Sequence, residues 1–223
     1  MRNLILILLI VSNSYSQKKI LIEYSAIFMG ELLTETQKKD ALMVERFSGI
    51  EDNIETTKFT LTYVDGISIF KSVPKMSIGE DNFATKMASL IASENDIFYK
   101  DNQTALLIEN TEFDGTIFNI TVKTDNNWIL KKDSKKIAGF DCLKATKNEK
   151  GIEVIAWYCP KLPYSLGPLK YTDLPGIILE LERDQIKYIA TKINLNYKGK
   201  EIPLLPTGKN ISRTEYLEIV KAN

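Results

Sequence analysis

The 223-residue sequence contains no histidine. This absence excludes Ser-His-Asp and Cys-His catalysis, zinc sites with histidine ligands, and switches that depend on imidazole titration. Carboxylates, lysines, tyrosines and two cysteines remain for chemistry, so a hydrolase acting through carboxylates stays open as an alternative. No spacing typical of a metal loop or a cofactor site is found. We therefore predict no catalytic residue, no metal and no cofactor.

An excess of charge of either sign is also missing. Lys and Arg together number 29, and so do Asp and Glu. Nucleic-acid binding needs a concentrated basic surface, so we expect no nucleic-acid partner. The composition, 44% hydrophobic and 26% charged, is that of a globular protein with a real core.

No apolar run is long enough to cross a bilayer, which takes about 20 residues. The run from Leu4 to Val11 follows Arg2 and precedes Ser14 and Ser16, which stand at positions −3 and −1 of a cut before Gln17. This pattern predicts a signal peptide over residues 1–16, with a retained helix as the alternative. We therefore expect an exported protein of the periplasm or cell envelope, with no transmembrane segment after cleavage. Residues 17–223 are predicted to form a single domain.

Strand-like runs dominate the rest of the chain. Many are β-branched or alternate apolar with polar residues, and Asp65-Gly66 and Asp114-Gly115 mark turns between them. Short strands at this spacing indicate an antiparallel meander, and so many strands must curl or close. The fold prediction is mainly β, a curved antiparallel sheet or half-barrel. The predicted strands are 18–29, 57–64, 67–73, 97–100, 104–110, 116–123, 128–132, 140–147, 152–159, 176–182 and 188–196.

Helical patterns occupy three segments. Thr34–Ile50 and Phe83–Ser93 each carry an apolar stripe, and the first ends near Gly49. In the last segment, 211–222, Ser212 and Glu215 have the spacing of a capping box. We expect one or two helices packed on the concave face of the sheet, and a C-terminal helix.

Four prolines gather in the segment that joins two late strands. Pro160, Pro163, Pro168 and Pro175 each lack a backbone donor, so 160–175 must cross between strands. Leu174-Pro175-Gly176-Ile177 fits a type II turn in which Gly176 has a positive φ. This predicts a structural role for the turn: it sets the register of the next strand.

The stretch "LGPLKYTDLPGIILEL" resembles the signature of the GLPGLI family, secreted proteins of Gram-negative bacteria with no established activity. The similarity extends through "KKIAGFDCLKAT" and "EVIAWYCPKLPYSLGP" and covers roughly 137–220. The resemblance implies a secreted protein and a structural motif. The motif consists of Gly167, Pro168, Leu174, Pro175 and Gly176. Asp173 stands where the family has its first glycine, and aspartate tolerates positive φ.

Cys142 and Cys159 lie on adjacent predicted strands. Folding these strands about Glu149–Ile152 would place the cysteines opposite each other, and an exported protein meets an oxidising compartment. We predict a disulfide, with two buried thiols as the alternative. A catalytic cysteine is disfavoured because no histidine can activate it.

Aromatic side chains cluster around the proline-rich segment. Trp157, Tyr158, Tyr164 and Tyr171, with the neighbouring carboxylate Asp173, are the predicted ligand-binding residues. The alternative is that they only cover the core.

The leading functional hypothesis is a binding or accessory protein for an apolar or peptidic ligand, with an outer-membrane transport system as candidate partner. The alternatives are an envelope protein–protein interaction module and a histidine-free hydrolase. A hollow interior without titratable groups favours the first, a filled interior the second, and two carboxylates facing each other in a cleft the third.

Overall fold

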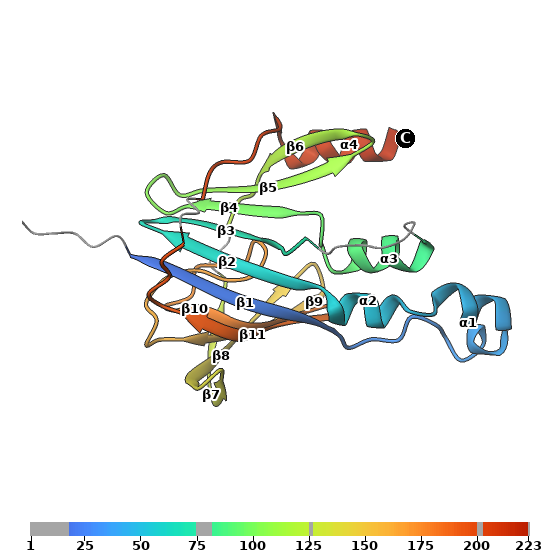
Figure 1. Cartoon of the computed structure of the whole chain (residues 1–223), viewed down its shortest axis with the longest axis horizontal. Helices are drawn as coiled ribbons and strands as arrows, with labels where there is room; N and C mark the ends of the chain where they lie inside the picture. The colour runs from blue at the N-terminus through green and yellow to red at the C-terminus, as the bar shows by residue number, and fades with distance from the viewer. Residues whose placement is uncertain (1–17, 75–81, 125–126, 200–202, 223) are drawn as a thin grey trace, which may run out of the picture.

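The computed structural model describes residues 18–74, 82–124, 127–199 and 203–222. The predicted signal peptide, residues 1–16, lies outside the described residues. Figure 1 shows a sheet that runs through the whole molecule, with helices at one end of the strands.

In the described residues, twelve strands form one open sheet in the order β12-β6-β5-β4-β3-β2-β1-β11-β10-β9-β8-β7. All neighbours are antiparallel except β12 and β6. The prediction of a mainly β fold is confirmed. The strands are β1 Lys19–Phe28, β2 Lys58–Val64, β3 Ile67–Ser72, β4 Ile97–Asp101, β5 Leu106–Phe113, β6 Thr116–Thr121, β7 Ile129–Ile137, β8 Phe140–Glu149, β9 Ile152–Cys159, β10 Ile177–Arg183, β11 Ile186–Asn194 and β12 Lys209–Ile211.

The connection between β6 and β7 requires the sheet to curve. β6 is second in the sheet and β7 is last, ten strand spacings away, or roughly 48 Å in a flat sheet. The chain from Thr121 to Ile129 makes only eight Cα steps, which span at most about 29 Å. The two ends of the sheet must therefore approach each other, and this creates a concave side between them.

Within the ranges that the structure describes, four α-helices accompany the sheet: α1 Ala41–Phe47, α2 Ile50–Thr56, α3 Phe83–Ile91 and α4 Arg213–Ala222. The prediction of one helix over Thr34–Ile50 is wrong. A 3-10 turn at Gln37–Lys39 precedes α1, and Gly49, with φ of 82°, separates α1 from α2. The capping box of α4 is confirmed, because the Ser212 amide donates to Glu215 Oε2 at 2.8 Å and the Glu215 amide donates to Ser212 Oγ at 3.2 Å.

The hydrophobic core lies around β1 and α2. Ile20, Ile22 and Tyr24 of β1 are almost fully buried, as are Ile50 and Ile54 of α2. The buried phenol of Tyr24 donates a hydrogen bond to the Ile178 carbonyl at 2.8 Å. This part of the molecule is filled by side chains and ties β1 to the start of β10.

The proline-rich segment, residues 160–176, folds back onto the sheet. Its leucines Leu162, Leu166, Leu169 and Leu174 are buried. The amides of Ile177 and Ile178 donate to the carbonyls of Leu162 and Leu166, at 3.0 and 2.8 Å. The segment is therefore a packed layer over the start of β10.

The type II turn predicted at Leu174–Ile177 is wrong. The Gly176 amide donates to the Leu174 carbonyl at 2.8 Å, which closes a three-residue turn about Pro175. Gly176 does have a positive φ, 157°. The glycine is required chiefly by space, because a Cβ there would lie 2.2 Å from the Cys159 carbonyl oxygen. The packing of this segment against the end of β9, which is not local in sequence, decides the turn.

Candidate ligand-binding cavity

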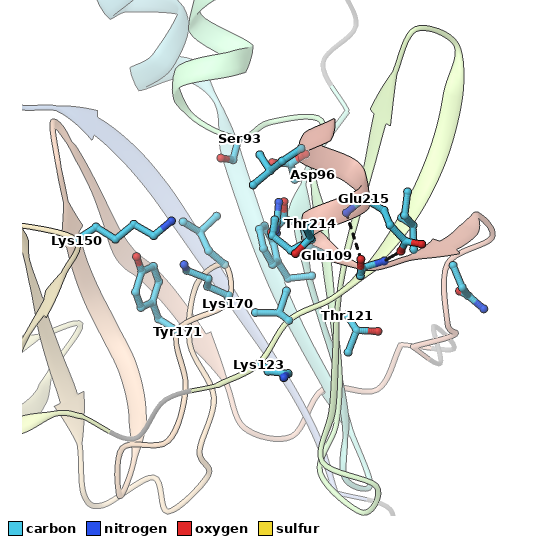
Figure 2. Close-up of a pocket in the computed structure, with 18 of the residues that line it drawn as sticks. Ser93, Asp96, Glu109, Thr121, Lys123, Lys150, Lys170, Tyr171, Thr214 and Glu215 are labelled. Atoms are coloured by element: carbon cyan, nitrogen blue, oxygen red, sulfur yellow. Dashed lines mark hydrogen bonds and ion pairs between the residues drawn. The ribbon is translucent and has the colours of Figure 1, made fainter. Parts of the chain in front are cut away.

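A cavity of about 990 Å³ lies between the two ends of the curved sheet. One wall comes from β5, β6, β12 and α4, and the other from the β8–β9 turn, the proline-rich segment and β10. Figure 2 shows Asp96, Glu109 and Glu215 on one side and Lys150, Lys170 and Tyr171 on the other. These walls are far apart in the sheet order, so the cavity depends on the curvature.

We call the wall that carries Asp96 and Glu109 the acidic wall. One of these carboxylates is ion-paired and the other is partly buried. Glu109 of β5 is ion-paired with Arg213 at the start of α4. Burial raises the pKa of the Asp96 carboxyl, and the charge of Glu109 adds to this. Hydrogen bonds with Thr111 and Ser93 and the charge of Arg213 act in the opposite direction.

The opposite wall, here called the basic wall, carries Lys150, Lys170 and Arg183 around one carboxylate, Glu149. Lys170 Nζ lies 2.9 Å and Arg183 Nε 3.8 Å from the Glu149 carboxylate. The Tyr171 hydroxyl donates to Glu149 Oε2 at 2.7 Å. Burial opposes ionisation of Glu149, but the hydrogen bonds from Tyr171 and Lys170 and the charges of Lys170 and Lys147 lower its pKa. Glu149 is thus held in its charged form, and its carboxylate holds Lys170, Arg183 and Tyr171 together in this wall.

Lys150 stands apart from that network. It lies in the β8–β9 turn and lines the cavity. Within the part of the chain that the structure describes, no ion pair is found for it. Lys150 is therefore available to a ligand carboxylate.

The structure brings two of the five predicted ligand-binding residues to this region. Tyr171 lines the cavity, and Asp173 lines a small recess beside it. Tyr158 is buried in the core. Trp157 lies under Lys135, whose Nζ is 4.2 Å from the ring centre, and Tyr164 packs on Tyr63, with ring centres 5.1 Å apart. None of these three lines the cavity.

Asp173 is bound to the fold by several contacts. Its backbone φ is 67°, and its amide donates to Ser165 Oγ at 2.7 Å. Its carboxylate lies 3.5 Å from the nearly buried Lys100 Nζ, which also donates to the Ser165 carbonyl at 3.1 Å. Lys100 belongs to β4, so this ion pair fastens the proline-rich segment to the other half of the sheet.

The sequence did not point to most of the cavity residues. Asp96, Glu109, Lys150 and Arg213 come from four segments that are distant in sequence. Each reads as an ordinary solvated charge in a turn, strand or helix. The only signal was the capping box at Ser212 and Glu215, which located the start of α4 without indicating what it faces.

Cys142 and Cys159 are both buried and are free thiols in the structure. Leu143 of β8 pairs with Tyr158 of β9, so the next pair along the ladder is Cys142 opposite Cys159. Burial raises the pKa of the Cys142 thiol to about 12, and the neighbouring Cys159 adds to this shift. The geometry brings the two residues together as expected, and the disulfide stays a prediction.

Residues 146–180 match a family model described as "Protein of unknown function (Porph_ging)". This is an uncharacterised family. The matched stretch holds most of the basic wall, including Glu149, Lys150, Lys170 and Tyr171. It also holds the residues on which the GLPGLI resemblance rests most strongly. A comparison with curated proteins finds no match.

Among solved structures, the chain resembles two crystal forms of one protein. "Structure of PNGF-II in P21 space group" aligns with a TM-score of 0.58 at 10% identity, and "Structure of PNGF-II in C2 space group" with 0.57 at 12%. Each alignment covers 92% of this chain and 33% of the other. The chain thus spans about a third of the length of these structures, and at such identity the likeness shows the fold alone.

The described part of the chain contains neither a membrane-spanning helix nor a metal-binding cluster. None of the helices there combines the length and apolar character needed to cross a bilayer. Across residues 18–74, 82–124, 127–199 and 203–222, no group of three or more Cys, Asp or Glu side chains is arranged to hold a metal ion. The side chains that line the cavity include carboxylates, ammonium groups, two guanidinium groups and a phenol.

Proposed function

We propose that this protein is an exported periplasmic or cell-envelope binding protein whose cavity takes a peptidic ligand of mixed charge. Export is supported by the signal-peptide pattern of residues 1–16. Binding is supported by the cavity of about 990 Å³, which is within the size range of ligand pockets. An outer-membrane transport system as partner belongs to the same proposal.

The observation that carries the proposal is the opposite charge of the two walls. The acidic wall presents Asp96 and Glu215, and the basic wall presents Lys150 and Lys170. A zwitterionic ligand can satisfy both walls at once, since a peptide carries an ammonium group and a carboxylate. An apolar ligand would desolvate these charges without pairing them, which is costly. The cavity therefore favours the peptidic over the apolar ligand.

A carboxylate hydrolase is the second candidate, because Asp96 and Glu109 line the cavity together and the pKa of Asp96 is raised. Catalysis by two carboxyl groups needs one of them free to attack or to accept a proton. Glu109 is ion-paired with Arg213, which favours binding over catalysis. An interaction module without a small ligand would leave the cavity unused.

The test uses peptide retention. We would incubate the chain without residues 1–16 with a tryptic digest of casein and identify retained peptides by native mass spectrometry. We expect one peptide per chain, and we expect Lys150→Glu to weaken binding of the tightest peptide at least tenfold. Lys131→Glu, on the exposed edge strand β7, is the matched control and should bind like the wild type. Failure to retain any peptide, or equal binding by Lys150→Glu, would overturn the proposal. Cleaved peptides would favour the hydrolase.

A further inference from the structure

A recess of about 50 Å³ opens beside the large cavity, and Val122, Lys123 and Lys170 line both. A water molecule needs about 10–15 Å³ on this measure, so the recess has room for about three to five small atoms. It is too small for an aromatic ring. It can take the end group of a ligand that lies in the larger cavity.

The side chains around the recess carry more positive than negative charge. Lys100 lies 3.5 Å from Asp173, and Lys170 and Arg183 lie 2.9 and 3.8 Å from Glu149. Lys123 adds a fourth cation, for which the described residues provide no ion pair. Lys100 and Arg183 do not line the recess itself. Its lining carries Lys123, Lys147 and Lys170 against Glu149 and Asp173, which leaves one positive charge.

One polar atom in the recess wall lacks a partner. Thr172 lines the recess and is 6% exposed, and its Oγ1 has no hydrogen-bond partner among the described residues. Its backbone carbonyl accepts a bond from Trp128 Nε1 at 2.9 Å, so the residue is held in place. Buried hydroxyls without a partner are rare in native proteins. Because Oγ1 is itself shielded from solvent, an acceptor in the recess would meet it after a rotation of the Thr172 side chain about χ1.

We infer that the recess is a subsite for a carboxylate group, formed by Lys123, Lys170 and the Thr172 hydroxyl. A carboxylate has three heavy atoms, so it fits a recess with room for about three to five. A phosphate has five and would fill the recess completely, which is why the test below compares the two anions. The charge of the carboxylate offsets the excess positive charge, and one of its oxygens accepts from Thr172 Oγ1. The identity of the ligand rests on the proposed function: if the cavity binds a peptide, this carboxylate is the peptide's C-terminus or one of its acidic side chains.

The first test addresses the recess without a peptide. Sodium acetate is titrated into isotopically labelled protein, with sodium chloride as the ionic-strength control, and the Trp128 indole and Thr172 amide signals are followed by NMR. We expect saturable shifts with acetate, and at least fivefold weaker binding in Lys123→Gln and in Thr172→Val. Lys131→Gln should behave like the wild type. Lys123 is exposed, so Lys123→Gln should fold and keeps the test valid even if Thr172→Val does not fold.

The second test compares two forms of the tightest casein peptide, one with a free C-terminal carboxylate and one with an amide. We expect the free carboxylate to bind at least tenfold more tightly, and Lys123→Gln to remove this preference without changing the affinity for the amide. If the recess binds an acidic side chain of the peptide instead, changing that Asp or Glu of the peptide to Asn or Gln should weaken binding, and Lys123→Gln should remove this difference in affinity.

The outcomes separate the two proposals. Saturable acetate binding without any peptide binding would support the recess and refute the proposed function. Peptide binding without either preference, and without acetate shifts, would refute the recess and leave the proposed function standing. Saturation by inorganic phosphate and not by acetate would overturn the assignment to a carboxylate.

Discussion

Gly176 offers a sharp test of how the proline-rich segment is fixed. A Cβ at this position would lie 2.2 Å from the carbonyl oxygen and 2.5 Å from the carbonyl carbon of Cys159. Both are backbone atoms at the end of β9, where Cys159 pairs with Ile177. Gly176→Ala must therefore displace the backbone of β9 or β10. Overpacking of this kind costs about 1–3 kcal/mol, and we expect the upper end because no flexible side chain can yield.

Gly139 is the matched control. It also has a positive φ, 85°, but a Cβ there would meet nothing within 4 Å. Gly139→Ala should therefore cost only the backbone strain, about 1–2 kcal/mol. If φ alone required glycine, the two alanine variants would lose similar stability. The close contact predicts that Gly176→Ala loses about 1 kcal/mol or more beyond Gly139→Ala.

The assay is urea unfolding, followed by tryptophan fluorescence, with the midpoints and slopes of both variants compared with the wild type. An unchanged slope would assign the midpoint shift to stability. The reasoning is refuted if Gly176→Ala unfolds at the same midpoint as Gly139→Ala or at a higher one.

Three further predictions follow from single contacts. Asp173→Gly should be more stable than Asp173→Ala by about 1 kcal/mol in the free energy of unfolding, because alanine would have to keep the φ of 67°. Both variants lose the ion pair with Lys100, so that loss cancels in the comparison. Equal midpoints in urea would contradict this. Burial raises the pKa of Asp96, so ionising this carboxyl destabilises the folded state as the pH rises above the ordinary pKa of about 3.9. Asp96→Asn should therefore gain more stability at pH 7 than at pH 4. Urea melts that show the same gain at both pH values would rule this out. Neither Cys142 nor Cys159 should react with a maleimide in unfolded, unreduced protein if the predicted bridge forms, and labelling of both would exclude it.

Local patterns in the sequence predicted most of the fold. Strands such as β2 and β9 have clear β character, and their predicted bounds differ from the observed ones by at most one residue. β12 was missed, because Lys209–Ile211 has only three residues and no alternation. The helix break at Gly49 was read as an end, although Ile50 and Ile54 continue a helical spacing into α2.

The cavity could not be predicted in the same way. Tyr171 and Asp173 were found because they neighbour an unusual proline-rich segment. Asp96, Glu109 and Lys150 carry no such mark, and they meet only because the sheet curves and brings its two ends together. The turn at Gly176 was misassigned for a related reason, since the contact that decides it is with Cys159. Local propensity cannot report contacts between segments so far apart in sequence.

The central claim is that the charged cavity between the two ends of the sheet binds a peptidic ligand. The most direct measurement is an NMR chemical-shift map of labelled protein titrated with the tightest casein peptide. We predict saturable shifts at Asp96 and Lys150, on opposite walls, and at Tyr171, with none along the edge strand β7. Shifts confined to α1–α3 or to β7, with the cavity signals unchanged, would contradict the account.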